Sequence, residues 1–376
     1  MVVIKPIEPT PRELKKYVQY GIDLYKGNDC FVPPLIMDEV GTLDPKKNPA
    51  FDHCQTKMWM AYDDGRPVGR ITAIINRLAN EKFGEKTMRF GFVDFIDDKE
   101  VVDKLFSAAE EWGREQGMTR AVGPMGFSDM DNEGMLTFGF DELATMAGVY
   151  NYPYYPMHME RMGWTKEVDY VEYLLTVPDA IPEKYARVAA IVEKRLDLKV
   201  KRFKSRRALK EQYGQAIFDL INEAYAGLYG YVPLTPRQIE HYIDMYLGIL
   251  RLDTISVIVD KDDKLVCVGI SMPSMSQALR KSGGKLFPFG WWPLLKGLKG
   301  DHTDIVDLLL VAVKPEYQNK GVNALLFNDL IPSFQAHGFK YAESNVELEG
   351  NESVQKQWEL FDRRLHKRRR IWQKNL

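Results

Sequence analysis

The chain has 376 residues, of which 45% are hydrophobic and 28% charged, with a formal net charge of -2. This balance is typical of a folded globular protein, and it excludes both a disordered chain and one drawn to nucleic acid by its net charge. The length exceeds what one ordinary hydrophobic core needs and predicts two domains.

Cysteine usage and the absence of long apolar runs indicate the compartment. Cys30, Cys54 and Cys267 are scattered and lack Cys-x-x-Cys spacing, which favours a reduced protein without a disulfide framework. The six histidines are dispersed too, so we expect no metal site. No charged region followed by a long apolar core opens the chain, and no apolar run is long enough for a membrane span. We therefore expect a cytoplasmic protein with no stable membrane insertion and no nucleic-acid partner; its oligomeric state stays open.

The first half mixes strands and helices. Two β-branched runs on either side of an Asp-Asp-Gly turn indicate a β-hairpin, and a later amphipathic pattern ends at Gly117, a residue typical of a helix C-terminus. The expected elements, in chain order, are a helix over 11–26, strands over 58–62, 68–75 and 89–96, a helix over 99–116 and a strand over 168–177.

The second half repeats this order. Gly69 and Gly269 are separated by 200 residues (269−69), and so are Asn151 and Asn351 (351−151). Several echoes in the same order favour an internal duplication. The expected elements are a helix over 209–229, strands over 254–259, 265–272 and 305–313, a helix over 321–337, a strand over 341–346, a helix over 352–364 and a strand over 367–373.

A proline-bearing break at 178–182 separates the halves and predicts domains over 1–178 and 179–376. Alternating strands and helices predict an α/β (α+β) fold in which helices cover a mixed sheet in each domain.

The strand over 305–313 leads through a polar turn into a helix. A helix that begins at Lys320 or Gly321 would leave its first N–H groups unpaired, at the positive end of its dipole. Such an end binds anions, and a glycine lets a phosphate approach the backbone closely. The alternative is that the turn only caps the helix. At the equivalent place in the first half Asp97, Asp98 and Glu100 stand instead; Asp97 could cap the helix, with Glu100 completing a capping box. Because carboxylates repel a diphosphate, we expect only the second half to bind one.

This turn resembles the acyl-CoA pyrophosphate loop of the GNAT acyltransferase superfamily, whose pattern is Val-x-Pro-x-x-(Arg/Gln)-x-x-Gly-x-(Gly/Ala). Val313, Gln318 and Gly321 fit the pattern, and Asn323 replaces its last small residue. The end of the chain, from Leu348-Glu349-Gly350-Asn351 to the basic run at 367–374, resembles that of uncharacterised bacterial tandem GNAT proteins.

The resemblance implies tandem GNAT folds, each a mixed, mostly antiparallel sheet covered by helices. The domain over 1–178 would be degenerate, and the domain over 179–376 would bind acetyl-CoA or a longer acyl-CoA as cosubstrate. The implied activity is N-acyl transfer to an unidentified amine, with strand amides near Val311 polarising the thioester carbonyl. The candidate cofactor-binding residues are Val311, Val313, Gln318, Asn319, Lys320, Gly321, Val322, Asn323 and Asn351.

The implied reaction requires an acid that protonates the leaving thiolate and a base that deprotonates the acceptor. Superfamily enzymes that use a tyrosine as general acid carry it about seven residues after the position of Asn351, and Trp358 stands there. An indole cannot protonate a leaving thiolate. A general base is still needed to deprotonate an ammonium acceptor. Glu343, Glu347 and Glu349 alternate along one expected strand and would share a face. Glu343 is the first candidate for the base, and Asp307 is the second.

Several alternatives stay open. The aromatic run at 287–292 and the tyrosines at 150–155 would pack in a core, or else hold a large apolar acyl or acceptor group where the two halves meet; the aromatic run could also touch a membrane. The basic run at 367–370 is expected to be a solvated edge strand. The chain could be a non-catalytic acyl-CoA-binding or interaction protein, or a Fem-like aminoacyl transferase that uses tRNA; its charge balance speaks against the latter.

Overall fold

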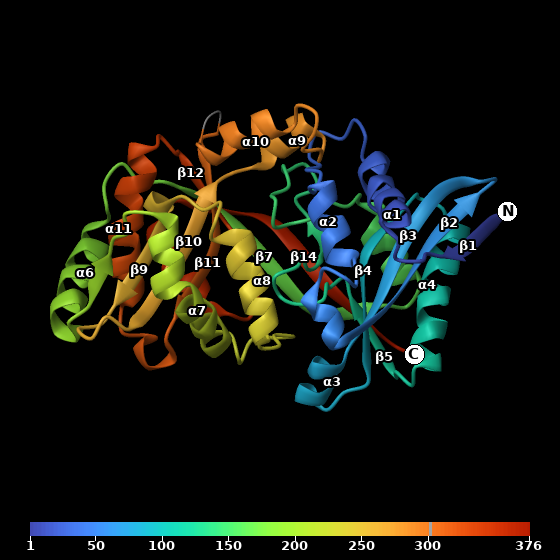
Figure 1. Ribbon diagram of the computed structural model, residues 1–376, viewed down its shortest axis with the longest axis horizontal. Coiled ribbons are helices and arrows are strands. Elements are labelled where there is room, and N and C mark those ends of the chain that lie inside the picture. The colour runs from blue at the N-terminus through green and yellow to red at the C-terminus, as the bar shows by residue number, and fades with distance from the viewer. Residues whose placement is uncertain (301–302) are drawn as a thin grey trace. The chain divides into compact units, whose positions relative to one another are not determined.

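The computed structural model describes residues 1–300 and 303–376 (Figure 1). The fold is mixed α/β and mostly antiparallel, which confirms the expected fold class. The chain divides into two compact units. Unit 1 comprises Met1–Val171, Ala278–Pro293 and His366–Leu376, and unit 2 comprises Glu172–Gln277 and Leu294–Leu365. The sequence places one boundary after residue 178; the units change at Val171, and unit 1 also takes up two later segments. Where one GNAT-like domain gives way to the next stays a prediction.

The sheet of unit 1 has the strand order β1-β2-β3-β4-β5-β14-β7, and β6 pairs with β14. β4 and β5 pair in parallel. The strands are β1 (Val2–Pro6), β2 (Cys54–Asp63), β3 (Arg66–Asn76), β4 (Thr87–Phe95), β5 (Arg120–Gly123), β6 (Met135–Phe138), β7 (Thr165–Thr176) and β14 (Arg363–Asn375). The helices are α1 (Pro11–Leu24), α2 (Ile36–Leu43), α3 (Arg77–Phe83), α4 (Lys99–Glu115) and α5 (Tyr154–Arg161).

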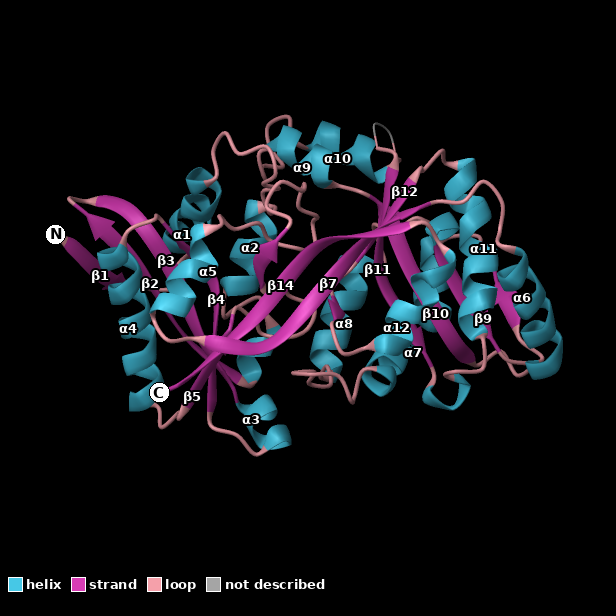
Figure 2. Cartoon of the chain, turned by 180° about the vertical axis from the view of Figure 1, so that it is seen from behind, coloured by secondary structure: helices cyan, strands magenta, loops and turns pink. Residues whose placement is uncertain are grey.

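The sheet of unit 2 has the order β7-β12-β11-β10-β9-β8, and β13 pairs with β7. β11 and β12 pair in parallel. The strands are β8 (Lys199–Lys201), β9 (Ile255–Val259), β10 (Leu265–Pro273), β11 (Ile305–Val313), β12 (Tyr341–Ser344) and β13 (Glu347–Leu348). The helices are α6 (Glu183–Leu196), α7 (Arg206–Ala224), α8 (Pro236–Tyr246), α11 (Val322–Ala336) and α12 (Glu352–Gln357). Two further short helices, α9 (Ser276–Ser282) and α10 (Trp291–Leu298), follow one another along the chain (Figure 2).

The glycines that stand 200 residues apart have the same role in the two units. A Cβ atom on Gly69 of β3 would lie 2.4 Å from Leu105 Cδ1 of α4. A Cβ atom on Gly269 of β10 would lie 2.6 Å from Leu326 Cδ1 of α11. In each unit a helix therefore packs directly onto a strand backbone, which accounts for this echo between the two halves.

The basic run near the C-terminus is buried, so the expectation of a solvated edge strand is wrong. β14 lies between β5 and β7 in the sheet of unit 1, and the side chains of Lys367 and Arg369 are almost fully buried. Arg370 pairs with both oxygens of Asp169, at 2.8 and 3.0 Å. The charged side chains of this basic run are thus buried or paired within unit 1.

Other expected elements end earlier than their patterns suggest. The strand expected over 341–346 stops at Ser344, and the helix expected over 352–364 becomes a 3-10 turn at Trp358–Leu360, before β14 begins at Arg363. Because the strand is interrupted, alternation no longer places Glu347 and Glu349 on the face of Glu343. Within the described residues, no helix combines the length and the hydrophobicity needed to cross a membrane.

Unit 1 buries three carboxyl groups in the loop after β5. Burial raises the pKa of Asp129 to about 7, that of Asp131 to about 6 and that of Glu133 to about 8, and repulsion between Asp129 and Glu133 adds to the effect. Glu133 Oε2 accepts a hydrogen bond from Tyr170 Oη at 2.9 Å, whereas its Oε1 has no partner among the described residues. These groups hold protons in the folded state that they would release when unfolded.

This cluster predicts that stability falls as the pH rises. The stabilisation is complete below the ordinary values of 3.8 and 4.5 and is lost as the pH passes through the folded-state pKa values. Between about pH 5 and about pH 9 the free energy of unfolding should fall by several kcal/mol, because each pKa unit corresponds to about 1.4 kcal/mol. Glu133→Gln keeps an acceptor for Tyr170 and should make the decline of the melting temperature shallower, whereas the exposed Glu81→Gln should leave it unchanged. If the melting temperatures of the wild type and of both variants declined in parallel with rising pH, this explanation would be contradicted.

Candidate functional site

β12 pairs with β11 only along the first part of β11. The paired residues run from Ile305 opposite Tyr341 to Leu308 opposite Ser344. Beyond this point β12 ends, while β11 continues to Val313 and, among the described residues, pairs only with β10. A β-bulge at Leu309 marks the change, because Ile270 and Ser271 of β10 lie opposite Leu310 and Leu308. The far half of β11 therefore has an open edge.

The backbone groups of Val311 and Val313 point to this edge. Lys314 N–H donates to the carbonyl of Val266 at 2.9 Å, so Lys314 faces β10. Hydrogen bonding alternates along an antiparallel pair, so Ala312 faces β10 too, whereas Val311 and Val313 face away. Both the N–H and the C=O of each of these valines therefore lie on the edge of β11 that faces away from β10, where β12 no longer pairs.

Side chains satisfy the carbonyl groups of the open edge. Asn345 Nδ2 donates to Leu309 O at 3.0 Å, Tyr225 Oη to Val311 O at 2.9 Å, and Gln318 Nε2 to Val313 O at 3.1 Å. Asn345 also donates its backbone N–H to Leu308 O at 3.2 Å, at the point where the strands separate. In the chain as described, the N–H groups of Val311 and Val313 have no acceptor on this edge. Two backbone donors thus remain for a bound molecule.

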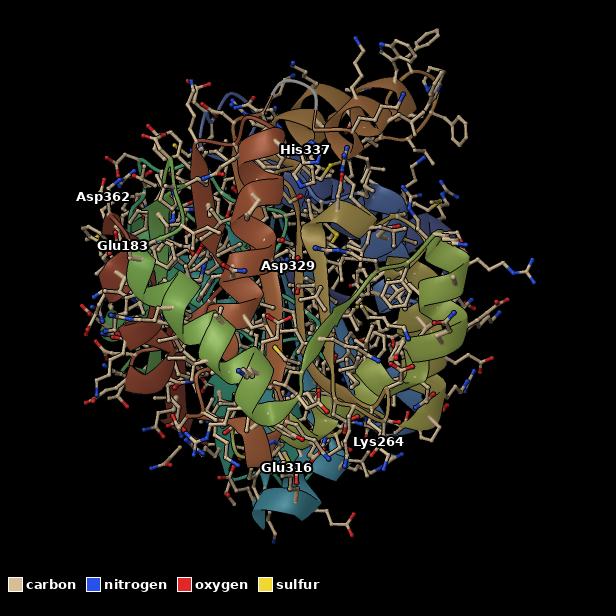
Figure 3. The ribbon with its side chains drawn as sticks, turned by 90° about the vertical axis from the view of Figure 1, so that its left-hand side faces the viewer. Glu183, Lys264, Glu316, Asp329, His337 and Asp362 are labelled. Carbon is tan, nitrogen blue, oxygen red and sulfur yellow. The ribbon has the colours of Figure 1, made fainter. Side chains whose placement is uncertain are left out.

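The turn after β11 ends at the N-terminus of α11, which begins at Val322, one or two residues later than expected. Asn319 and Gly321 have positive φ angles of 60° and 84°. No side chain caps the helix, and the N–H groups of Gly321, Val322 and Asn323 have no acceptor among residues 1–300 and 303–376. Figure 3 shows Glu316 and His337 at opposite ends of α11, with Glu316 marking the end where these donors lie. This geometry suits an anion.

Gly321 is required for two reasons. Its φ angle is unfavourable for residues with a side chain, and a Cβ atom would lie 3.0 Å from Val188 Cγ1 and 3.1 Å from Val192 Cγ2 of α6. Helix α6 crosses α11, as Figure 3 shows with Glu183 at the start of α6 and Asp329 within α11. The sequence reading missed α6, although its buried Tyr185, Ala189 and Val192 have helical spacing.

The remaining expected cofactor residues have mixed surroundings. Lys320 is exposed, with Nζ 5.7 Å from the centre of the Tyr317 ring. Asn323 Nδ2 donates to Gln357 Oε1 at 3.1 Å, so this side chain joins α11 to α12. Asn351 immediately precedes α12.

The equivalent site in unit 1 is closed by its own side chains. Phe95 lies opposite Gly69 as Val311 lies opposite Gly269, but Phe95 N–H donates to Tyr155 Oη at 3.1 Å and Phe95 O accepts from Tyr154 Oη at 2.7 Å. Tyr155 therefore belongs to the core of unit 1 and is no substrate wall.

A carboxylate of unit 1 also closes the helix end that corresponds to the start of α11. Asp98 Oδ1 accepts from Val101 N–H at 3.0 Å at the start of α4. The cap is Asp98, not Asp97 as the sequence suggested; Asp97 Oδ1 instead lies 2.8 Å from His158 Nε2. Glu100 pairs with Lys104 at 2.7 Å, and no capping box forms.

The two candidate bases are brought together with a third carboxyl group. Asp307 of β11 lies directly opposite Glu343 of β12, so both side chains project from the same face of the sheet. Glu172 of β7 shares that face, and its carboxylate oxygen lies within 4.8 Å of that of Glu343. All three residues are at least nine-tenths buried, on the face away from α11. The sequence missed Glu172 because strand pairing brings it there.

Trp358 is buried and hydrogen-bonded to a carboxyl group. Its Nε1–H donates to Glu347 Oε1 at 2.7 Å. Glu347 Oε2 is buried and has no partner within the described chain. Burial raises the pKa of Glu347 to about 7, although the hydrogen bond from Trp358 lowers it. At neutral pH this carboxyl group can both take up and release a proton.

The aromatic run at 287–292 is not part of a core. Phe287, Phe289, Trp291 and Trp292 are 73%, 79%, 40% and 55% exposed. The interpretation of these rings as core residues is therefore wrong.

Comparisons with known proteins place this geometry in a family. No model of a known protein family matches the chain. "Protein YghO" of Escherichia coli (strain K12) is 28% identical over 369 residues, which cover 97% of this chain and 93% of that protein. The "Bacterial ceramide synthase" of Caulobacter vibrioides is 30% identical over 318 residues, which cover 82% of this chain and 80% of that protein.

Solved structures share the fold. A tandem GNAT protein from the clavulanic acid biosynthesis pathway has a TM-score of 0.59 at 12% identity. The superposition covers 100% of this chain and 98% of that protein. A probable N-acyltransferase from Enterococcus faecalis has a TM-score of 0.53 at 9% identity. The superposition covers 100% of this chain and 73% of that protein. The chain belongs to the family of the bacterial ceramide synthase, and it shares the fold of tandem GNAT proteins. The expected resemblance to GNAT proteins is thereby confirmed in the fold, while the roles of individual residues stay predictions.

If acyl-CoA binds only at α11, charge reversal beside that helix should weaken its binding. Lys320→Glu should raise the dissociation constant roughly thirtyfold, because an attraction of about 1 kcal/mol becomes a repulsion of similar size. The matched control is Lys340→Glu, an exposed lysine beyond the other end of α11. Calorimetric titration should give one site per chain; two sites, or equal weakening by both changes, would contradict the assignment. Gly321→Asp is a poorer probe because its side chain would collide with α6.

Proposed function

We propose that this protein is an acyl-CoA-dependent N-acyltransferase whose cosubstrate binds in unit 2. The observation that carries the proposal is the open edge of β11, which leads directly to the uncapped start of α11. Acyl-CoA carries a diphosphate and an extended arm with two amide groups. A carbonyl group of the arm could accept a hydrogen bond from the N–H of Val313, with the thioester at Val311, while the diphosphate binds at Gly321. The two domains of the proposal are those over 1–178 and 179–376.

The chemistry follows from where these donors lie. The N–H of Val311 would polarise the thioester carbonyl and stabilise the negative charge that develops on its oxygen. The nitrogen of the acceptor amine attacks the carbonyl carbon, a C–N bond forms, the nitrogen releases its second proton to water, and the C–S bond breaks. An ammonium acceptor must first lose a proton. Glu343 would take it, with Asp307 as second choice, and Glu172 adds negative charge that attracts the ammonium group.

The leaving thiolate needs a proton, which the indole of Trp358 cannot supply. We assign this role to Glu347, whose carboxyl group lies against Trp358 and has a pKa of about 7. Support comes from its burial and from its free Oε2 among the described residues. The hydrogen bond from Trp358 would hold Glu347 in place and lower the proton affinity that burial raises.

The acceptor class follows from the ceramide synthase relative. A ceramide is the amide of a fatty acid with a long-chain amino alcohol, so we propose a long-chain amino alcohol as acceptor and a long-chain acyl-CoA as donor. Because acyl-CoA is a cytoplasmic metabolite, the proposal places the protein in the cytoplasm. A non-catalytic acyl-CoA-binding protein is the second candidate, favoured by Trp358 in place of a tyrosine. Nothing in the site favours Fem-like transfer from tRNA.

The proposed base predicts a selective loss of turnover. With palmitoyl-CoA and a long-chain amino alcohol, Glu343→Gln should lower kcat roughly a hundredfold, because general-base catalysis is removed. Its affinity for palmitoyl-CoA should not change. Glu349→Gln, which alters an exposed carboxylate after β13, is the matched control. Absence of turnover in the wild type, together with tight palmitoyl-CoA binding, would favour the second candidate.

The assignment of Glu347 predicts a change in pH dependence. Glu347 donates its proton only below its pKa, so kcat should fall as the pH rises through about 7. Trp358→Phe removes the hydrogen bond that lowers this pKa, so the fall should move to higher pH with most of the activity retained. Glu347→Gln should lower kcat roughly tenfold or more and abolish the decrease of kcat with rising pH. An unchanged pH–rate profile in Trp358→Phe would refute the assignment.

A further inference from the structure

Four large aromatic side chains are exposed together between α9 and the first turn of α10. Phe287, Phe289, Trp291 and Trp292, here called the aromatic patch, all belong to unit 1. Single exposed hydrophobic residues are normal on protein surfaces, but four rings within six residues are not. Such a concentration needs an apolar partner.

The backbone holds the aromatic patch in a fixed conformation. Trp291 N–H donates to Leu286 O at 2.8 Å, and Trp291 Nε1–H donates to Pro288 O at 3.2 Å. Ile36 N–H donates to the carbonyl of Gly284 at 2.9 Å and so anchors the segment to α2. The rings of Trp291 and Trp292 meet edge to face, with centroids 5.6 Å apart. The exposure therefore belongs to an ordered loop.

The charged residues of the segment that carries the aromatic patch have one sign. Residues 273–300 contain no Asp or Glu, although the whole chain has a net charge of -2. Their basic residues are Arg280, Lys281, Lys285, Lys296 and Lys299. Arg280 pairs with Asp29 at 3.1 Å, while Lys281 and Lys285 are exposed on the same segment as the rings. A partner for this surface should be apolar and anionic at once.

We propose that the aromatic patch docks the protein onto the surface of an anionic lipid bilayer. Trp and Phe rings insert favourably at the boundary between headgroups and acyl chains, and lysines beside them attract anionic headgroups. This combination matches a lipid surface better than a second copy of the chain docked through the same patch, because that would bring the basic residues of the two patches together. The inference goes beyond the proposed function, and its test needs no turnover.

The test is co-sedimentation of the full chain with vesicles of phosphatidylcholine alone or of phosphatidylcholine with phosphatidylglycerol. The wild type should sediment with the anionic vesicles, and high salt should weaken this binding. Phe287→Ala/Phe289→Ala should lower the partition coefficient at least tenfold, because two inserted rings are lost. Lys281→Gln/Lys285→Gln should lower it about tenfold at low salt only.

The matched control is Phe83→Ala/Phe138→Ala, which removes two other exposed rings of unit 1. It should sediment like the wild type, and all variants should keep the wild-type melting temperature. Absence of wild-type binding to the anionic vesicles, or an equal loss in the control, would overturn the proposal. So would light scattering that shows a dimer dissolved by Phe287→Ala/Phe289→Ala, because the patch would then join two copies.

Discussion

The separation of β12 from β11 is the constraint on which the candidate site depends. A strand that loses its neighbour exposes backbone groups, and their burial without partners would be costly. Asn345 fixes the point of separation by bonding to Leu308 and Leu309. Tyr225 and Gln318 then satisfy the next two outward carbonyl groups. Only N–H donors are left, which explains why this edge suits a molecule that offers carbonyl acceptors.

The two units share an architecture but differ in the hydrogen bonds made at equivalent positions. In unit 1 the tyrosines of α5 bond to the backbone of Phe95, and Asp98 caps α4. In unit 2 the corresponding positions, Val311 and the start of α11, keep their donors free among the described residues. The two units thus differ here in local side chains, while Phe95 and Val311 keep equivalent places opposite Gly69 and Gly269 in the sheet.

The sequence could predict the parts of the site that are local. The pattern from Val313 to Gly321 joins a strand, a turn and a helix within one short segment, and the structure has these elements in this order. The carboxylates could be predicted only in part. Asp307 and Glu343 come from neighbouring strands, but Glu172 joins them through the antiparallel pairing of β7 with β12, which no short pattern encodes.

Long-range placement accounts for the errors as well. Alternating basic residues are typical of an edge strand, yet β14 is central in unit 1, because its neighbours β5 and β7 come from far earlier in the chain. The bond between Trp358 and Glu347 was likewise hidden, since the break after Ser344 turns Glu347 away from the face of Glu343. Such features follow from strand order and register.

The central claim is that acyl-CoA pairs with the open edge of β11 and the start of α11. Amide hydrogen exchange, measured with and without palmitoyl-CoA, tests it at the backbone groups themselves. The account predicts that exchange slows at Val311, Val313 and the first residues of α11, while Phe95 in β4 stays unchanged. Equal slowing in both units, or no slowing at Val311 and Val313 at saturating palmitoyl-CoA, would contradict it.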